Sequence, residues 1–154
     1  MPLVYVQGDL LAAPQYVIAH PCNCQGAMGR GIALAVRTRY PQCYERYRVF
    51  CRKEQFRPGM AWLYQAPDGH LIANLATQEF WGAGQRQART EWIEHSMRAL
   101  MKRLVTMGIH EFACPKMGCG LGGLTWDEVR PVYERLCQEF PEFTVYVYDL
   151  RGES

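Results

Sequence analysis

The amino-acid sequence predicts an α/β fold of three layers, in which a mixed central sheet is covered by helices on both faces. The main observation is that segments with strand-like apolar runs alternate along the chain with segments that have helical apolar spacing. A second observation is the turn sequence Pro67-Asp68-Gly69, which separates two strand-like segments and predicts a hairpin within the sheet. The 154 residues, 49% of them hydrophobic and 21% charged, are enough to bury the core of one domain. We therefore expect residues 1–154 to form a single domain.

Six segments are expected to be strands, because each has a short apolar or β-branched run next to turn-forming residues. The run at residues 16–20 is continuous rather than alternating, which is typical of a buried strand. This strand is expected to end at His20, where a glycine-rich loop begins. The other five expected strands are residues 3–6, 60–65, 71–75, 109–114 and 143–148.

Four segments are expected to be helices. The strongest pattern is at residues 90–107, where apolar residues recur at helical spacing and Gly108 ends the helix. A helix that runs to about residue 136 is expected to begin at Thr125, because Thr125 and Glu128 have the spacing of a capping box. The remaining two expected helices are residues 32–40, which stop before a proline, and residues 41–53.

Composition and charge exclude several classes of protein. The formal net charge of +2 is too small to indicate nucleic-acid binding by itself. No apolar run reaches the length of about 18 residues that a membrane helix needs, so no membrane partner is expected. The first residues have neither a basic stretch nor a long apolar stretch, so we expect no signal peptide and a cytoplasmic location.

The seven cysteines indicate neither a disulfide framework nor a metal site. Their number is odd and no secretory signal is expected, which argues against disulfides. Cys22 and Cys24 are separated by one residue, whereas paired cysteines of zinc sites are commonly separated by two or more. No second close pair follows, and the four histidines are scattered. We therefore expect no metal and no cofactor, and we expect most thiols to fill the core.

Two glycine-rich segments, residues 23–31 and 117–123, each follow an expected strand and precede an expected helix. Glycines let the backbone approach a ligand closely, and free N–H groups at the start of a helix attract anions. In an open α/β sheet, ligands bind beyond the carboxyl ends of the strands, so two such loops predict a phosphate or diphosphate site. Neither segment has the pattern of a Walker A loop or of a dinucleotide-binding fingerprint. The alternative is that both segments are ordinary tight turns.

Together with other segments, the two loops resemble the macrodomain family, whose members bind ADP-ribose. The matching segments are residues 8–10, 17–41, 71–78, 115–129 and 144–150, which occur in order over nearly the whole chain. The resemblance implies a three-layer α/β/α macrodomain fold, with ADP-ribose or ADP-ribose 1″-phosphate as the ligand.

The resemblance also implies roles for individual residues. In the family, the aspartate of the first turn contacts adenine, which implies this role for Asp9. An asparagine after the second strand reaches the distal ribose, which implies Asn23. Tyr148 and Leu150 are expected beside the adenine. The other implied binding residues, which belong to the first turn and to the two glycine loops, are Gly8, Leu10, Met28, Gly29, Arg30, Gly31, Ile32, Met117, Gly118, Cys119, Gly120, Leu121 and Gly122.

Two branches of the family are nearest. The branch that removes ADP-ribose from glutamate or from thymidine in DNA carries a lysine after the strand that corresponds to residues 71–77. Its protein-directed members carry an aspartate in the second loop, and this sequence has Gln78 and Gly122 at these two places. The ADP-ribose-1″-phosphate phosphatases have a histidine followed by a small residue, Cys, Asn and Cys, which residues 20–24 match.

The resemblance to the phosphatases gives the leading expectation for function. We expect an enzyme that binds an ADP-ribose derivative and hydrolyses its distal 1″ substituent, with phosphate released from ADP-ribose 1″-phosphate. One alternative is a glycohydrolase that removes ADP-ribose from DNA or protein. The other alternative is a reader that binds ADP-ribose without any chemistry.

His20 is the candidate catalytic residue. A histidine at the end of a strand can exchange a proton beside a bound phosphate. The alternative is a buried histidine that only holds the first loop. Cys119 is expected to be structural. Residues 79–89, which contain Phe80, Trp81 and Arg86, are either a contact to nucleic acid or a plain surface loop.

Overall fold

The computed structural model of the chain describes residues 2–81 and 87–149. Its six strands form one mixed sheet in the order β1-β6-β5-β2-β4-β3. All neighbouring strands are parallel except β3, which is antiparallel to β4. The predicted mixed sheet and the predicted hairpin are therefore confirmed. The strands are β1 (Leu3–Gln7), β2 (Val17–Cys22), β3 (Ala61–Gln65), β4 (Leu71–Ala76), β5 (Glu111–Cys114) and β6 (Thr144–Asp149).

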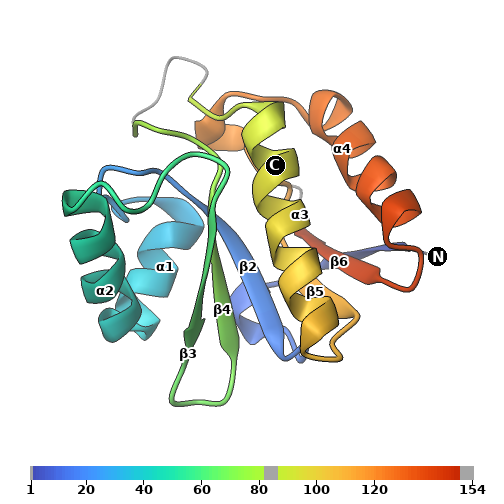
Figure 1. Ribbon diagram of the computed structural model, residues 1–154, viewed down its shortest axis with the longest axis horizontal. Coiled ribbons are helices and arrows are strands. Elements are labelled where there is room, and N and C mark those ends of the chain that lie inside the picture. The colour runs from blue at the N-terminus through green and yellow to red at the C-terminus, as the bar shows by residue number, and fades with distance from the viewer. Residues whose placement is uncertain (1, 82–86, 150–154) are drawn as a thin grey trace.

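The helices cover both faces of this sheet, as Figure 1 shows. α1 (Gly31–Arg39) and α2 (Pro41–Arg52) lie on one face, and α3 (Thr90–Thr106) and α4 (Trp126–Glu139) lie on the other. Two short 3₁₀ helices, η1 (Leu10–Ala12) and η2 (Gly120–Gly122), follow β1 and β5. The three-layer prediction is confirmed, and no helix of the described residues is long and apolar enough to cross a membrane.

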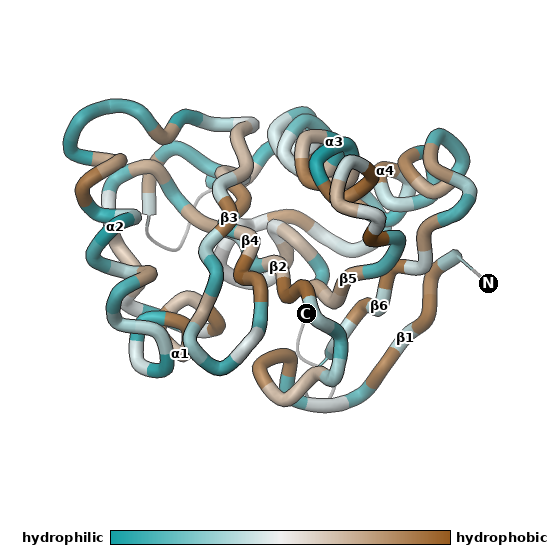
Figure 2. The backbone as a smooth tube through the Cα atoms, turned by 60° about the horizontal axis from the view of Figure 1, so that its bottom comes forward, coloured by the Kyte–Doolittle hydropathy of each residue, from teal (hydrophilic) through white to brown (hydrophobic). Residues whose placement is uncertain are grey.

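Two hydrophobic cores lie between the sheet and its two helical layers, one on each face. Val17 and Ala19 of β2 contribute to the core under α3 and α4, whereas Ile18 and Cys22 contribute to the core under α1 and α2. Successive side chains of a strand point to opposite faces, so a strand buried on both faces needs a continuous apolar run. β4 satisfies this need because all of its residues are buried (Figure 2 colours most of it as hydrophobic).

Most expected elements differ from the observed ones only at their ends, and the important difference is at β2. The strand was expected to end at His20, but it continues through Pro21 to Cys22. Proline has no N–H to donate, yet the position is tolerated because β2 pairs in register with β5 only at Ile18. Two further residues therefore separate His20 from the loop that follows the strand.

A crevice is expected where neighbouring strands send the chain to opposite faces of the sheet. β2 and β5 are such neighbours, since β2 leads to α1 on one face and β5 leads through η2 to α4 on the other. Both glycine-rich loops follow these two strands. The fold therefore brings the two predicted loops to the same edge of the sheet.

Candidate functional site

Four segments meet at the carboxyl edge of the parallel strands. They are the turn at residues 8–10, loop 1 (residues 23–30, between β2 and α1), the segment after β4, and loop 2 (residues 115–125, between β5 and α4). The N–H group of Cys24 in loop 1 donates to the carbonyl oxygen of Glu79 after β4, at 3.0 Å. The N–H groups of Gln87 and Ala88 donate to the carbonyl oxygen of Gly122 in loop 2, both at 3.0 Å. The segment after β4 thus connects the two loops.

Asn23 folds loop 1 from within. Its Oδ1 accepts hydrogen bonds from the N–H groups of Gln25 (2.9 Å) and Ala27 (3.3 Å) and from the hydroxyl of Tyr47 (2.8 Å). Its Nδ2 donates to the carbonyl oxygen of Ala27 at 2.8 Å. The carboxamide therefore sets the shape of the loop, and Tyr47 ties it to α2.

The N-terminus of α1 offers backbone donors to a ligand. The first turn of a helix has N–H groups without partners inside the helix, and here the side chain of Arg30 at the N-cap makes no capping bond. The first helical bond runs from the N–H of Leu34 to the carbonyl of Arg30 (3.2 Å), and the described residues supply no acceptor for the N–H groups of Gly31 and Ile32. Arg30 and Gly31 are exposed, and a Cβ placed on Gly29 would meet no atom within 4 Å.

The N-terminus of α4 differs from that of α1, because side chains cap it. The side chain of Thr125 accepts a hydrogen bond from the N–H of Glu128, and the carboxylate of Glu128 accepts one from the N–H of Thr125. This is the predicted capping box. Of the two helices that follow the glycine loops, α1 is the one without a side-chain cap, and free N–H groups at the start of a helix bind anions.

Three glycines with positive φ angles, Gly118, Gly120 and Gly123, determine the path of loop 2. Gly118 has φ +76°, and a Cβ there would lie 2.8 Å from Cδ1 of Ile93. Gly120 has φ +75°. Met117 is buried, and its N–H donates to the hydroxyl of Tyr133 at 3.0 Å. The loop therefore packs its backbone closely against α3, which only glycine at position 118 allows.

Cys119 is half-buried in loop 2, and burial raises the pKa of its thiol to about 11. Such a thiol is protonated near neutral pH, so it is a poor nucleophile. The same holds for the other cysteines, whose pKa values are all raised by burial. All seven cysteines are free, and no group of three His, Cys, Asp or Glu side chains within the described residues could hold a metal ion.

The turn after β1 forms the other end of the crevice. Asp9 is exposed, and its Oδ1 accepts a hydrogen bond from the N–H of Leu11 at 3.0 Å. The N–H of Gly8 donates to the carbonyl oxygen of Asp149 (3.2 Å), which places the turn beside the end of β6. The carboxylate of Asp149 pairs with Lys116 of loop 2, with 3.0 Å between Nζ and Oδ2.

Several expected contact residues turn their side chains into the core. Leu10, Met28 and Tyr148 are buried, and Ile32 packs against the core under α1 and α2. They can therefore shape the crevice from below, whereas backbone groups are left to face a ligand. Leu150 and Arg86 lie outside the described residues, as does the side chain of Leu121, although its backbone forms part of η2.

Gln78 and Gly122 lie next to each other in space although 44 positions apart in the sequence. A Cβ placed on Gly122 would lie 3.7 Å from Oε1 of Gln78 and 3.0 Å from Cβ of Ala88. Nε2 of Gln78 donates to the carbonyl oxygen of Phe80 at 2.6 Å. The two positions at which the resemblance leads one to expect the lysine and the aspartate of the deacylating branch thus lie together, and here they carry an amide and a glycine.

His20 lies below loop 1 rather than at the surface of the crevice. Its side chain is fully buried on the face covered by α1 and α2, where Nε2 donates to Oδ1 of Asn74 at 2.7 Å. Nδ2 of Asn74 donates in turn to the carbonyl oxygen of Trp62 at 3.1 Å. Burial lowers the pKa of His20 from 6.5 to about 4, and the hydrogen bond to Asn74 offsets this only in part. The imidazole is therefore neutral near pH 7 and in contact with protein groups.

Sequence reasoning missed two residues that support the site. Asn74 is a fully buried amide inside the apolar strand β4, and a polar residue in such a run signals a required partner. Tyr47 gives no comparable signal, because the amphipathic pattern of α2 accounts for any apolar residue at its position. Phe80 and Trp81, which the sequence analysis singled out in the segment after β4, are exposed, at 57% and 64%.

Comparison with known proteins assigns the chain to a family. Residues 19–133 match the model of the Macro domain. The chain belongs to the Macro domain family. The macrodomain of Mycobacterium tuberculosis DarG superimposes with a TM-score of 0.86 at 29% identity, over 95% of this chain and 96% of that one. Thermosipho africanus DarTG, solved in complex with ADP-ribose, gives a TM-score of 0.79 at 26% identity, over 94% of this chain and 41% of that one.

Two curated relatives of this macrodomain carry different enzyme names. A DNA ADP-ribosyl glycohydrolase of Mycobacterium tuberculosis is 30% identical over 99% of this chain, which spans 43% of that relative. An ADP-ribose 1″-phosphate phosphatase of Lodderomyces elongisporus is 29% identical over 97% of this chain and 100% of the relative. This macrodomain thus spans less than half the length of the glycohydrolases that it matches.

Proposed function

We propose that this macrodomain binds ADP-ribose derivatives in the crevice and hydrolyses the substituent at the distal 1″ position. The proposed preferred substrate is ADP-ribose 1″-phosphate. The observation that carries the proposal is the uncapped start of α1 at Gly31, at the edge of the sheet where loop 2 follows the neighbouring strand β5. Two sets of backbone donors suit a diphosphate, and they add no charge of their own.

Binding itself supplies much of the proposed catalysis. When the diphosphate is held by the two loops and the adenine lies near Asp9, the distal ribose is fixed at the segment after β4. Its 1″ substituent then lies beside Gln78, whose amide can hold a water molecule or a phosphate oxygen by hydrogen bonds. Holding a substrate and a water molecule in reactive geometry accelerates hydrolysis without a charged nucleophile.

We assign His20 the role of a positioning residue. Through Asn74 it links β2 and β4 directly beneath loop 1, and its burial argues against proton exchange with a substrate. This is the second of the two roles considered from the sequence. Glycohydrolysis of DNA adducts is the second candidate function, supported by the 30% identity to DNA ADP-ribosyl glycohydrolases over nearly the whole chain.

One panel of substrates separates the candidate functions. The purified chain is incubated with ADP-ribose 1″-phosphate, ADP-ribosylated DNA and ADP-ribosyl-glutamate, and phosphate and ADP-ribose release are measured. We expect phosphate release from the first substrate and no release of ADP-ribose from the other two. Release from DNA alone would replace the phosphatase proposal with the glycohydrolase, and binding of ADP-ribose without any turnover would replace both with a reader.

Gln78 gives the panel an internal control. Gln78→Lys restores the amine that the deacylating branch carries, whereas Gln78→Met has similar length and neither charge nor amide. If only Gln78→Lys releases ADP-ribose from DNA while the wild type is inactive on all three substrates, the chain is a lapsed glycohydrolase.

The proposed location is the cytoplasm, which the seven free thiols support because thiols remain reduced there.

A further inference from the structure

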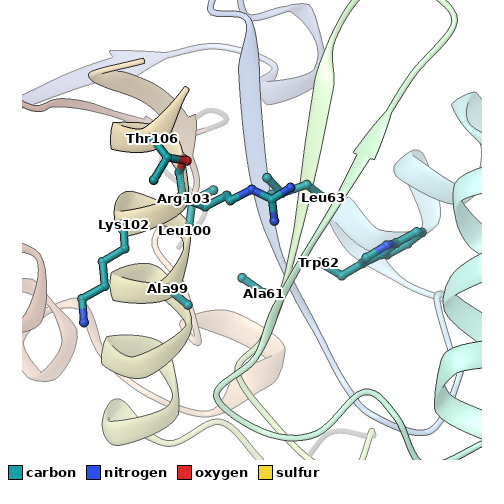
Figure 3. Close-up of a pocket in the computed structure, with 8 residues that line it drawn as sticks. All are labelled: Ala61, Trp62, Leu63, Ala99, Leu100, Lys102, Arg103 and Thr106. Atoms are coloured by element: carbon teal, nitrogen blue, oxygen red, sulfur yellow. The ribbon is translucent and has the colours of Figure 1, made fainter. Parts of the chain in front are cut away.

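A groove of about 600 Å³ lies between the edge strand β3 and α3, away from the crevice (Figure 3). Ala61 and Leu63 line it from β3, and Ala99, Arg103 and Thr106 line it from α3. The groove exists because the two elements present small side chains, Ala61 and Ala99, at this place. β3 is the last strand of the sheet, and β4 separates it from β2 and from the loop 1 side of the crevice.

The hydrogen bonds that flank β3 show which of its backbone groups face outward. The N–H of Ala76 donates to the carbonyl oxygen of Met60, and the N–H of Ala66 donates to the carbonyl oxygen of His70, both at 2.8 Å. In an antiparallel pair, hydrogen-bonded residues alternate with residues that make no bond to the neighbouring strand. Met60 and Ala66 are six positions apart, so the residues of β3 that lie at two-residue steps between them, Trp62 and Tyr64, are the ones that bond to β4.

The backbone groups of Ala61, Leu63 and Gln65 therefore point away from β4, toward the free edge of β3. Within residues 2–81 and 87–149, no strand pairs with that edge. An unpaired row of N–H and C=O groups is a template for another extended chain. The side chains of Ala61 and Leu63 face α3, so a strand added at this edge would lie along the groove.

Two of the side chains that line the groove are cationic, Lys102 and Arg103. Figure 3 shows Arg103 extended from α3 toward β3, whereas the ammonium group of Lys102 points away from β3. No carboxylate of the described residues forms an ion pair with Arg103. Arg98, one turn earlier on α3, is instead paired with Glu94 and Glu139, at 2.9 Å in both cases. Arg103 is thus an unpaired site for a carboxylate beside an open strand edge.

We propose that the groove binds an extended, acidic peptide segment of another protein, which adds to the free edge of β3 as an additional strand. The outward N–H and C=O groups of β3 pair with the peptide backbone, and a carboxylate of the peptide binds Arg103. Side chains of an added strand alternate between the two faces of the sheet, so acidic residues at every second position would face α3. A nucleic acid offers phosphates to Arg103 but no backbone amides to the strand edge.

The probe is a fluorescein-labelled, blocked hexapeptide in which glutamate alternates with valine, and its binding is followed by anisotropy. We expect a dissociation constant below about 1 mM, and a loss of at least about tenfold when glutamine replaces glutamate in the peptide. Arg103→Glu should weaken binding to a similar extent. Arg130→Glu on α4 changes the net charge of the protein equally, and Arg130 is exposed and does not line the groove, so this variant should change binding by less than about twofold.

Pairing of the backbones is tested separately with a peptide in which every backbone nitrogen is methylated, because this removes the donors from the probe for either strand direction and leaves the protein unchanged. Binding should be lost. In ¹H–¹⁵N spectra, the unmodified peptide should shift the amide signals of Ala61 and Leu63 more than those of Trp62 and Tyr64. Absence of binding at about 1 mM, equal effects of Arg103→Glu and Arg130→Glu, unchanged binding of the methylated peptide, or stronger binding of a single-stranded oligonucleotide would each overturn the proposal.

Discussion

The buried histidine of β2 should make the stability of this macrodomain depend on pH in a defined range. In the folded chain the pKa of His20 is about 4, because the imidazole is buried, whereas in the unfolded chain it has the ordinary value of 6.5. As the pH falls below 6.5, the unfolded chain takes up a proton that the folded chain does not accept until about pH 4. The free energy of unfolding should therefore keep its full value above pH 6.5 and decrease as the pH falls toward 4.

The size of this effect follows from the two pKa values. One pKa unit corresponds to about 1.4 kcal/mol, so the whole difference corresponds to roughly 3 kcal/mol. Between about pH 7.5 and about pH 5 the expected loss is roughly 2 kcal/mol, a large part of the stability of an ordinary domain. His20→Gln keeps an amide that can donate to Asn74 and removes the titrating ring, so this variant should lack that loss.

The assay is urea unfolding of the wild type, His20→Gln and His95→Gln at about pH 7.5 and about pH 5. His95 is an exposed residue of α3, so its replacement leaves the buried network intact and controls for loss of a histidine. We expect the wild type and His95→Gln to lose roughly 2 kcal/mol more than His20→Gln between the two pH values. Equal losses in all three proteins would refute the argument from burial.

The same variant tests the positioning role of His20. Loss of a general acid or base typically lowers turnover by about 100- to 10,000-fold. We expect folded His20→Gln to retain turnover on ADP-ribose 1″-phosphate within about tenfold, because the imidazole touches only protein groups. A fall of more than about 100-fold, with unchanged ADP-ribose affinity, would instead make His20 the acid or base of the reaction.

Three further predictions concern the crevice and its support. ADP-ribose should raise the melting temperature of the chain. Asp9→Ala should weaken ADP-ribose binding by about tenfold in calorimetry, because it removes an exposed carboxylate that can accept a hydrogen bond from adenine. Equal affinities of the wild type and Asp9→Ala would exclude Asp9 from the site. Gly118→Ala should lower the free energy of unfolding by about 2–5 kcal/mol in urea titrations, through its positive φ and the overlap with Ile93, whereas Gly29→Ala should change it by less than about 0.5 kcal/mol. Thr125→Ala should lower the free energy of unfolding by about 1 kcal/mol in the same titrations, because it removes the cap of α4. An unchanged urea midpoint would show that the capping box does not contribute to stability.

The sequence by itself determined the elements whose causes are local. The continuous apolar run of β2 predicts a buried strand, and the spacing of Thr125 and Glu128 predicts the start of α4 to within one residue. The glycines of the two loops predict turns with exposed backbone. These features depend on side-chain periodicity and on short-range hydrogen bonds, which neighbouring residues encode.

Only the tertiary structure decided which of these elements meet and what faces the ligand. His20 pairs with Asn74, 54 positions away, because β2 lies beside β4 in a register that sets these two residues opposite each other. The order of the strands places β3 at the edge and β2 beside β5, and this order creates both the groove and the crevice. A local sequence pattern specifies whether a segment is a helix or a strand, but not which elements lie beside it, because those contacts depend on the packing of the whole core.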